Sequence, residues 1–554
     1  MNNIQQNRLK FIALSGTTGV TENLYVYEYG NDMIVVDCGV GFPDLEMPGV
    51  DLVLPDFSYI VKNKNKLRGI IASQGHDDHV GALPFLLREV SAPIWCTPLV
   101  TEFLKVKFKD YGVKNYRINT FNTDRDVFEV GPFKFKPLRV THSVPDTVGF
   151  AIETPEGKIF HVAEHKMDQT SVDGMSFDIA KAKKLAEGNT LCLMSDCLGS
   201  NEPGLAPSGV GIEEAMFKIA KDARQALYMT AISSSIGRFQ QMINVAQKVG
   251  RKVVLIGLSV QSKLEIAYNL GYLKYLPDQI IDIRDAKNLS PDKFMYIIAG
   301  CYGQVGSSVY RLAMGEHDRV EIREGDTFVF SADPGPAYSK ESIDLVVDEL
   351  IDKGADVHYY DLGEGLHVSG HGGQEDIKEL FRIVRPKYFI PTGGTIRYMK
   401  SYEKLVTEYG APKQNVFRLK PGESVIFEKG AARRGETIKT KEVLVHGLGI
   451  GDVGKVVLGD RAVLGNEGVV VVVFKVGRGG RIIAQPEIVS RGFVYEGKSM
   501  GLLDSATAEL HNVMNTKRIT NVKQIKDETI TFLEKHFFKV TGRHPMILPV
   551  VVEV

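Results

Sequence analysis

Short β-rich runs alternate with helical stretches along the first third of the chain, and this alternation restricts the fold more than any other feature. Apolar runs typical of strands occupy 11–14, 24–27, 33–36 and 69–72, and an apolar helical stretch follows at 81–87. Strands that alternate with helices indicate an α/β fold, in which functional groups stand on the loops that follow strands. The first part of the chain is therefore expected to be an α/β domain with its chemistry on loops.

A second α/β pattern begins near residue 208 and has the order of an inserted parallel-sheet domain. It consists of a helix at 213–221, a strand at 226–229, a helix at 238–248 and a strand at 252–256. A return to the first domain is expected at 356–360, with a later strand at 388–391. At 554 residues the chain is too long for one core, and we expect it to divide into 1–207, 208–350, 351–428, a linker at 429–450, and 451–554.

Charge and cysteine content indicate the cellular compartment of the chain and restrict the kinds of partner it can bind. Lysine and arginine number 67 against 68 aspartates and glutamates, so any nucleic-acid site must be a local basic patch. The five cysteines lie far apart without a Cys-x-x-Cys pair, which is typical of reduced thiols in a cytosol. No segment approaches the ~20 apolar residues of a membrane span, and the N-terminus lacks the apolar segment of a secretory signal. We expect a cytoplasmic protein with no membrane partner.

The segment 73–81, SQGHDDHVG, contains a candidate metal-binding loop. It gathers His76, Asp78 and His79 directly after a predicted strand. Imidazole nitrogens suit zinc or manganese, and a carboxylate can bridge two ions. An alternative interpretation is a polar loop that caps the following helix, since aspartate is common at the N-cap. The spacing alone leaves both interpretations open.

Further motifs recur in the order of a known family. Asp37 follows the strand at 33–36, and THSVPD, FHVAEH and HVSGHG stand at 141–146, 160–165 and 367–372. At these motifs the chain resembles the metallo-β-lactamase superfamily, its β-CASP nucleases and, over nearly the whole length, the ribonuclease J family. SRGFVY at 490–495 and PMILPV at 545–550 extend the resemblance. It implies an α/β fold: a metallo-β-lactamase αββα sandwich, an inserted β-CASP α/β domain at 208–350 and a small C-terminal α/β domain.

The resemblance implies seven metal-binding positions, of which this chain retains most. The family loop HxHxDH has glutamine at its first ligand position, Gln74, and the last family histidine is replaced by Gly393. The aspartate that bridges two ions in the family corresponds to Glu164, one methylene longer. The ligands that the resemblance predicts are His76, Asp78, His79, His142 and Glu164.

These departures weaken the expected site in different ways. An amide oxygen is a poor substitute for imidazole, and glycine offers no side chain at all. The expected cofactor is Zn²⁺ or Mn²⁺, as one ion rather than two, held by His76, His142 and Glu164, with Asp78, His79 and Glu164 as a weaker second group. If 160–165 is a strand, His165 points to the face opposite Glu164 and is not a ligand. His161 is expected to be structural.

The substrate side of the family site is better retained. Asp196 stands at the predicted end of a strand, where a turn cap is the alternative interpretation. By resemblance Asp196 is the proton-transfer carboxylate and His371 its partner. The same resemblance assigns contacts with the substrate phosphate to His367, Val368, Ser369, Gly370 and His371. The segments 233–236 and 300–304 depart from the family motifs at several residues.

Two function classes follow from retained substrate motifs beside altered ligands. The first is a ribonuclease J-like protein of RNA processing and decay that hydrolyses single-stranded RNA, from the 5′ end or internally, with weakened catalysis. The second is a non-catalytic RNA-binding scaffold that supports an active paralogue. A lactamase-type hydrolase of small molecules is a weaker third hypothesis, because the substrate motifs resemble those of the nuclease branch. The resemblance also implies a homodimer, a homotetramer or an assembly with a paralogous ribonuclease J.

Overall fold

The computed structural model describes residues 8–44, 46–172, 174–286, 289–335, 339–447, 449–494 and 496–554, with the side chains of 496–500 excepted. Tyr495, the last residue of the motif SRGFVY, lies outside the described residues. The chain forms two compact units. One contains Val53–Val443 and the residues before Pro43, and the other contains Pro43–Leu52 and Leu444–Val554.

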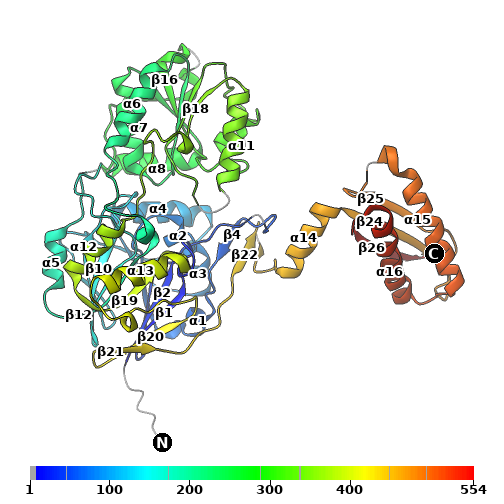
Figure 1. The fold of residues 1–554 in the computed structure, drawn as a ribbon, viewed down its shortest axis with the longest axis horizontal. Helices are drawn as coiled ribbons and strands as arrows, with labels where there is room; N and C mark the ends of the chain where they lie inside the picture. The colour runs from blue at the N-terminus through cyan, green and yellow to red at the C-terminus, as the bar shows by residue number, and fades with distance from the viewer. Residues whose placement is uncertain are drawn as a thin grey trace, which may run out of the picture. The chain divides into compact units, whose positions relative to one another are not determined.

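Two β-sheets form the centre of the first unit (Figure 1). The larger sheet has the order β21 (Ala431–Arg434), β20 (Ser424–Glu428), β1 (Leu9–Ser15), β2 (Leu24–Tyr29), β3 (Asp32–Val36), β5 (Leu67–Ile71), β6 (Ile94–Cys96) and β7 (Ile118–Thr120). The second has the order β19 (Pro386–Thr392), β12 (Thr190–Asp196), β11 (Gly157–Val162), β10 (Val148–Thr154), β9 (Phe133–Arg139) and β8 (Phe128–Val130). The strands expected at 11–14, 24–27, 33–36 and 69–72 thus lie side by side in one sheet.

The facing sides of the two sheets share one apolar core. Phe11 and Tyr27 from the larger sheet pack there with Phe135 and Phe150 from the second, and all four side chains are fully buried. β9 alternates buried and half-buried residues, which is the period of a strand that buries one face more deeply than the other. Packing of two sheets through such a core holds their strand ends at one common edge.

Helices cover the outer faces of both sheets. α1 (Ser58–Lys62), α2 (Asp77–Val80), α3 (Leu83–Glu89) and α4 (Pro98–Asp110) lie on the side of the larger sheet away from β10 and β12 (Figure 1). α5 (Ile179–Ala186), α12 (Gln374–Val384) and α13 (Ile396–Glu408) share a second buried core with the outer face of the other sheet. The order helix, sheet, sheet, helix confirms the expected αββα sandwich.

An inserted domain interrupts this sandwich between β12 and β19. Its sheet is parallel and has the order β15 (Ile280–Ile281), β14 (Lys252–Ile256), β16 (Phe294–Ile298), β13 (Leu227–Thr230), β17 (Thr327–Phe330) and β18 (Asp356–His358). α6 (Gly211–Asp222), α7 (Ile236–Lys248) and α8 (Leu258–Asn269) pack on one face, while α10 (Ser308–Ala313) and α11 (Ser339–Asp352) pack on the other (Figure 1). α9 (Ile283–Ala286) lies between β15 and β16 in the chain.

The structure differs from the sequence-based expectation at two joins. The strand at Asp356–His358, expected to mark the return to the first domain, pairs with β17 and forms the edge of the inserted sheet instead. The chain re-enters the sandwich after it, through α12 and β19. Residues 431–434, within the expected linker 429–450, form β21 and pair with β20. The local sequence does not show which sheet β18 and β21 join, because strand pairing depends on contacts with residues distant in the chain.

The second unit contains a three-stranded sheet covered by two long helices. Its elements are β22 (Val443–His446), β23 (Gly449–Ile450), α14 (Lys455–Glu467), β24 (Val469–Val476), β25 (Glu487–Arg491), α15 (Glu496–Lys517), α16 (Val522–Thr541) and β26 (Met546–Glu553). β24 lies between antiparallel β25 and parallel β26. Alternate residues of β24, from Val470 to Val476, are buried against α15 and α16. No helix in the described part of the chain combines the length and the apolar character that crossing a bilayer requires.

A buried arginine closes one end of the inserted sheet. The Arg251 guanidinium donates to the carbonyls of Gln225 at 2.7 Å, Phe294 at 3.1 Å and Ala223 at 2.5 Å, just outside the strands β13 and β14. Only 4% of Arg251 is exposed. The arginine thus gives a donor to the buried carbonyl of Phe294, the first residue of β16, and to two less buried carbonyls just before β13.

We predict that Arg251→Met destabilises the inserted domain by about 2 kcal/mol, because the buried carbonyl of Phe294 loses this donor and two half-buried carbonyls lose it as well. Amide hydrogen exchange of β14 and β16 measures this as a loss of protection. Arg224→Met, at an exposed position nearby, is the matched control and should change protection by less than ~0.5 kcal/mol. Equal protection in the two variants would contradict the capping role of Arg251.

Candidate functional site

The candidate site lies where loops from both sheets of the sandwich meet. β5 leads into the loop that carries His76, and β9 leads into the loop that carries His142. Glu164 follows β11, and Asp196 is the last residue of β12. Residues that are far apart in the sequence are therefore brought together because the strands that precede them end at the same edge.

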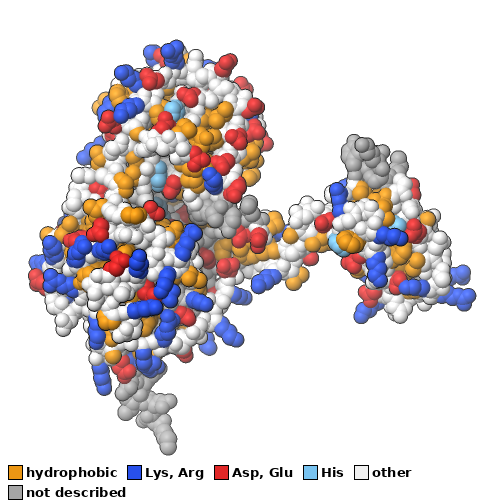
Figure 2. Space-filling model, viewed as in Figure 1, with side chains coloured by type: hydrophobic (Ala, Val, Ile, Leu, Met, Phe, Trp, Pro, Cys, Tyr) orange, Lys and Arg blue, Asp and Glu red, His pale blue; other side chains and the backbone are white. Residues whose placement is uncertain are grey.

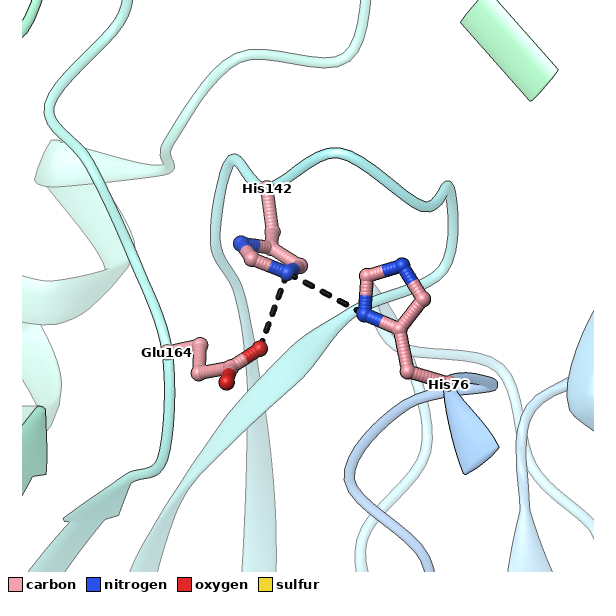
Figure 3. Close-up of side chains that lie close together, drawn as sticks. All are labelled: His76, His142 and Glu164. Carbon is pink, nitrogen blue, oxygen red and sulfur yellow. Dashed lines mark hydrogen bonds and ion pairs between the residues drawn. The ribbon is translucent and has the colours of Figure 1, made fainter. Parts of the chain in front are cut away.

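His76, His142 and Glu164 form the first convergent group. Figure 3 shows the three side chains pointing toward one another, with His142 between the other two. His142 Nε2 lies 2.8 Å from Glu164 Oε2 and 3.3 Å from His76 Nδ1. The three ligand atoms lie within 4.8 Å of one another, which is close enough to share one metal ion. The structure thus gathers the residues that the sequence predicted as a first metal site.

Asp78, His79 and Glu164 form the second group. His79 Nε2 lies 3.3 Å from Glu164 Oε1 and 3.5 Å from Asp78 Oδ2. These ligand atoms also lie within 4.8 Å of one another. Glu164 belongs to both groups, and its two carboxylate oxygens face different groups, Oε2 toward His142 and Oε1 toward His79. This orientation is the one that a bridging carboxylate needs.

Hydrogen bonds to the outer nitrogens orient two of the imidazole rings. Asp37 Oδ2 lies 2.8 Å from His79 Nδ1, and Asp37 in turn accepts from the backbone and hydroxyl of Ser73, both at 2.7 Å. The carbonyl of Gly370 lies 2.9 Å from His142 Nδ1. A ring whose Nδ1–H is held in this way directs Nε2 toward a metal. A side chain on Gly370 would come within 2.9 Å of the His142 ring, so glycine permits this contact.

Asp37 is an orienting residue to which the sequence analysis assigned no role. It directly follows β3, the position at which α/β folds carry functional groups, and that position is the signal available in the sequence. Its backbone is left-handed, with φ at 60°. This conformation is unfavourable for a residue other than glycine and is held here by the bonds to His79 and Ser73.

The electrostatics of the two groups favour a cation. Burial opposes protonation of His79, but the carboxylates of Glu164, Asp78 and Asp37 outweigh it and raise its pKa well above the ordinary value. Burial, with the nearby charge of Glu164, raises the pKa of Asp78 to about 7. Burial also opposes ionisation of Glu164, but His142 and His79 hold its pKa well below the ordinary value. The carboxylates thus favour positive charge in a buried space lined by imidazole, and this donor set fits a divalent transition-metal ion.

The two altered family positions differ in what they leave behind. Gln74 is fully buried, its amide nitrogen donates to Glu164 Oε2, and its amide oxygen has no partner among the described residues. Gly393 has φ at 65°, and a Cβ placed there would meet only Asp196 Oδ1, at 3.6 Å. The first position is filled by a weak ligand, and the second is open space beside the site.

Two other histidines of the same segment lie outside the convergent groups. β11 ends at Val162, so Glu164 and His165 belong to the following loop rather than to a strand. Both ring nitrogens of His165 are buried without a partner among the described residues. His161 lies in β11, where its Nδ1 is 2.9 Å from the hydroxyl of Tyr27 in the sandwich core. The prediction that a strand continues to residue 165 is therefore wrong. His165 nevertheless belongs to neither candidate ligand group.

Asp196 and His371 form a pair beside the candidate metal groups. His371 Nδ1 lies 2.6 Å from Asp196 Oδ2, and the other carboxylate oxygen accepts from the backbone of Leu198 at 2.7 Å. Burial opposes protonation of His371, but Asp196 and Glu164 outweigh it and raise the pKa of His371 to about 9. The ring therefore carries a proton at neutral pH and can donate it. The backbone bond also shows that Asp196 serves as a turn cap, the alternative interpretation of this residue.

The segment 367–370 links the site to the inserted domain. His367 Nε2 lies 3.4 Å from Asp333 Oδ1 of the inserted domain. Val368, Ser369 and Gly370 line a small pocket of about 60 Å³ next to His142. Burial lowers the pKa of His367. The predicted substrate residues thus divide between a polar contact with the inserted domain and a pocket wall.

Cationic side chains that sequence reasoning did not select line the same pocket. Lys166 and Arg238 stand on its wall with Gln241, whose buried amide oxygen has no partner among the described residues. Lys166 Nζ lies 3.4 Å from the carbonyl of Ser369, and Arg238 donates to the carbonyl of Leu366 at 3.3 Å. Lys166 Nζ also lies 3.5 Å from Asp168 Oδ2 on the same wall, so one of the two cations already faces a carboxylate. Arg238 is the cation better placed for a phosphate group. Neither residue forms a basic run in the sequence, so the folded chain alone reveals the pair.

Comparison with protein families divides the chain into four matched segments. Residues 33–178 match the beta-lactamase superfamily domain, and 224–350 match the beta-CASP domain of ribonuclease J. Residues 361–418 match the RNA specificity domain of Zn-dependent metallo-hydrolases, and 456–554 match the C-terminal domain of ribonuclease J. All five candidate ligands lie in the segment that matches the beta-lactamase superfamily domain, and His371 lies in the segment that matches the Zn-dependent family.

Individual proteins match over nearly the full length. Ribonuclease J2 of Bacillus subtilis is 32% identical, with 99% of both chains covered. Ribonuclease J 1 of Streptococcus pyogenes is 31% identical, covering 99% of this chain and 98% of its own. A crystal structure of an Enterococcus faecalis protein of unknown function aligns with a TM-score of 0.53 at 14% identity, over 76% of this chain and all of that one. This last likeness concerns the fold alone.

We predict that Gln74→His combined with Gly393→His raises the amount of Mn²⁺ bound per chain. Imidazole is a better ligand than an amide, and the space beside Gly393 can receive a side chain, although its left-handed backbone costs about 1 kcal/mol for a residue with a Cβ. Equilibrium dialysis with metal analysis measures the stoichiometry. Gln74→Asn, which keeps an amide, is the control. Unchanged binding in the double variant would show that these two positions do not limit the site.

Proposed function

The chain belongs to the ribonuclease J family, and from this membership we propose that it binds single-stranded RNA and hydrolyses its phosphodiester bonds with weakened, metal-dependent activity. The observation that carries the proposal is the orientation of Glu164, whose two oxygens face the two candidate ligand groups. The remaining donor atoms still converge, although two family positions, Gln74 and Gly393, have changed. We place this activity in RNA processing and decay, as 5′ to 3′ removal of nucleotides, internal cleavage or both.

We propose His76, His142 and Glu164 as the residues that hold the principal ion, Zn²⁺ or Mn²⁺, with Asp78, His79 and Glu164 as a weaker second group. A divalent ion at such a site supplies Lewis-acid polarisation of a phosphoryl oxygen. The protein contributes fixed ligand directions through Asp37 and the Gly370 carbonyl. One ion is favoured over two because Gly393 offers no ligand to the second group.

The Asp196–His371 pair is proposed to handle protons. Asp196 holds the Nδ1 side of the His371 ring at 2.6 Å, which leaves Nε2–H free of that bond. The carboxylate of Asp196 raises the pKa of His371 and so favours the protonated ring. The ring can therefore donate a hydrogen bond to a phosphate oxygen or a proton to the oxygen that leaves. Asp196 stabilises the charged ring and fixes its orientation.

Lys166, Arg238 and the segment 367–370 are proposed to contact RNA phosphates. The pocket that they line adjoins His142, so a bound phosphate would lie next to the candidate metal groups. Lysine and arginine mix with aspartate and glutamate over the face seen in Figure 2, without one continuous basic surface. RNA affinity is thus expected from this local site rather than from the general charge of the protein.

The alternative is a non-catalytic RNA-binding partner of an active ribonuclease J. The observation that favours it is the loss of imidazole at Gln74 and Gly393, beside a retained Asp196–His371 pair. In either case we expect a homodimer, a homotetramer or a complex with a paralogue. Five free, buried cysteines support a cytoplasmic location.

We predict that the purified chain degrades 5′-monophosphorylated single-stranded RNA in Mn²⁺ or Zn²⁺, and that His76→Ala lowers the rate roughly tenfold or more because a principal ligand is lost. Gel electrophoresis of end-labelled RNA measures the rate. His544→Ala, an exposed histidine of the second unit, should leave the rate unchanged.

A rate that is equal in His76→Ala and in the unchanged chain would identify a contaminating nuclease. RNA binding without degradation above that background would favour the scaffold alternative. Absence of both binding and degradation would contradict the proposal as a whole.

We also predict that Arg238→Gln weakens binding of single-stranded RNA and lowers the slope of log affinity against log salt by about 1, the effect of one lost phosphate contact. Fluorescence anisotropy across a salt series measures both quantities. Arg224→Gln is the matched control, since Arg224 lies in the same domain but outside the pocket. An unchanged salt slope in Arg238→Gln would remove Arg238 from the RNA site.

A further inference from the structure

One loop of the sandwich carries a proposed metal ligand at one end and a contact with the inserted domain at the other. Residues 141–147 connect β9 to β10. His142 stands at the start of this loop and directs Nε2 toward Glu164 and His76. Asp146 stands at its end. The position of His142 therefore depends on what holds the rest of the loop.

The middle of the loop is buried in the core of the inserted domain. Val144 is 1% exposed and lies in the same apolar cluster as Ile212 and Met216 of α6. Leu99 and Phe103 of α4, a helix of the sandwich, enter that cluster as well. The loop thus packs against the inserted domain rather than only against the sandwich from which it emerges.

Asp146 joins three segments through one residue. Its Oδ2 accepts from the backbone of Leu99 at 3.2 Å, in the first turn of α4, and from the hydroxyl of Tyr272 at 2.5 Å. Its carbonyl accepts from the hydroxyl of Thr97 at 3.3 Å. Tyr272 belongs to the inserted domain and follows α8. A single carboxylate therefore connects the ligand loop, the start of a sandwich helix and the inserted domain.

The backbone of Asp146 makes the loop depend on these contacts. Its φ is 62°, in the left-handed region that residues other than glycine, asparagine and aspartate rarely adopt. Such a conformation persists when surrounding interactions over-determine it. The bonds to Leu99 and Tyr272 are interactions of this kind. Their loss should let the loop relax and carry His142 away from Glu164.

A second contact holds the same two elements together. α4 packs against α8, and the ammonium of Lys263 lies 5.5 Å from the centre of the Phe103 ring. This contact contains no residue of the ligand loop. Loss of the Tyr272 hydroxyl should therefore loosen the loop without separating the inserted domain from the sandwich.

We propose that Asp146 and Tyr272 are positioning residues, through which the inserted domain sets the place of His142 and so the metal affinity of the principal site. This inference rests on the proposed metal site of His76, His142 and Glu164. Neither residue is a ligand. The Tyr272 hydroxyl acts on Asp146, Asp146 acts on the backbone of the loop, and the loop places the imidazole. Metal binding is thereby coupled to the docking of the inserted domain.

The test is calorimetric titration of the full chain with Mn²⁺ alone. Tyr272→Phe, which removes only the hydroxyl, should weaken binding roughly three- to tenfold. This is less than the roughly 10–100-fold effect of residues that bond to a ligand directly, because Tyr272 acts through Asp146 and the loop. Asp146→Ala should weaken it further, because the carboxylate also caps α4. Asp146→Asn should restore most of the affinity, since its amide oxygen accepts the same hydrogen bonds and asparagine tolerates a left-handed backbone.

Matched measurements separate positioning from general destabilisation. Tyr268→Phe alters a 37% exposed tyrosine of α8 and should leave Mn²⁺ affinity unchanged. Circular dichroism should show every variant folded at the titration temperature. Tyr272→Phe combined with Asp146→Ala should bind no more weakly than Asp146→Ala alone, because the two changes remove one shared interaction. A merely structural role would not produce this lack of additivity in metal affinity.

His76→Ala distinguishes failure of the inference from failure of the proposed function. If His76→Ala does not weaken Mn²⁺ binding, the proposed metal site is wrong. If His76→Ala weakens binding but Tyr272→Phe binds as tightly as the unchanged chain, the site stands and the positioning role of Tyr272 and Asp146 is overturned.

Discussion

The carboxylate of Glu164 is the group on which the arrangement of the site depends. It is buried, and a buried carboxylate is costly unless charged or hydrogen-bonding partners surround it. His142, from the loop after β9, and His79, from the short helix α2, approach its two oxygens, and the amide of Gln74 donates to it as well. The segments that carry these three side chains must lie close to Glu164 for its buried charge to have partners. The strand ends of both sheets are thereby tied to a single point.

The extra methylene of Glu164 fits this role. A glutamate reaches further from its backbone than the aspartate of the family, and here its two oxygens still face the two candidate groups. The replacement therefore conserves the connection between the groups while the outer positions, Gln74 and Gly393, have changed. Removal of this carboxylate would take away the one group that contacts both His142 and His79.

Much of the fold could be predicted because many strands and helices are recognisable from the local order of apolar and polar residues. The strands predicted from the apolar runs at 11–14 and 33–36, and the helices near 213–221 and 238–248, all occur in the structure as β1, β3, α6 and α7. The predicted ligands His76, His142 and Glu164 are also convergent. The roles of Asp37, Lys166, Arg238 and Gln241 were not predicted, since each contributes through contacts with residues distant in the chain. The pairing of β18 with β17 and of β21 with β20 was not predicted for the same reason, because the partner of a strand is not a property of the strand's own residues.

The sequence by itself determined the types of residue that could bind metal, the two positions at which such a residue is missing, and the order of the α/β elements. These properties follow from side-chain chemistry and from periodicity, which are local. Only the tertiary structure decided which oxygen of Glu164 faces which histidine, which backbone carbonyl directs His142, and which domain holds the loop that carries it. Those facts depend on distances between segments far apart in the chain, and such distances are set when the two sheets and the inserted domain pack together.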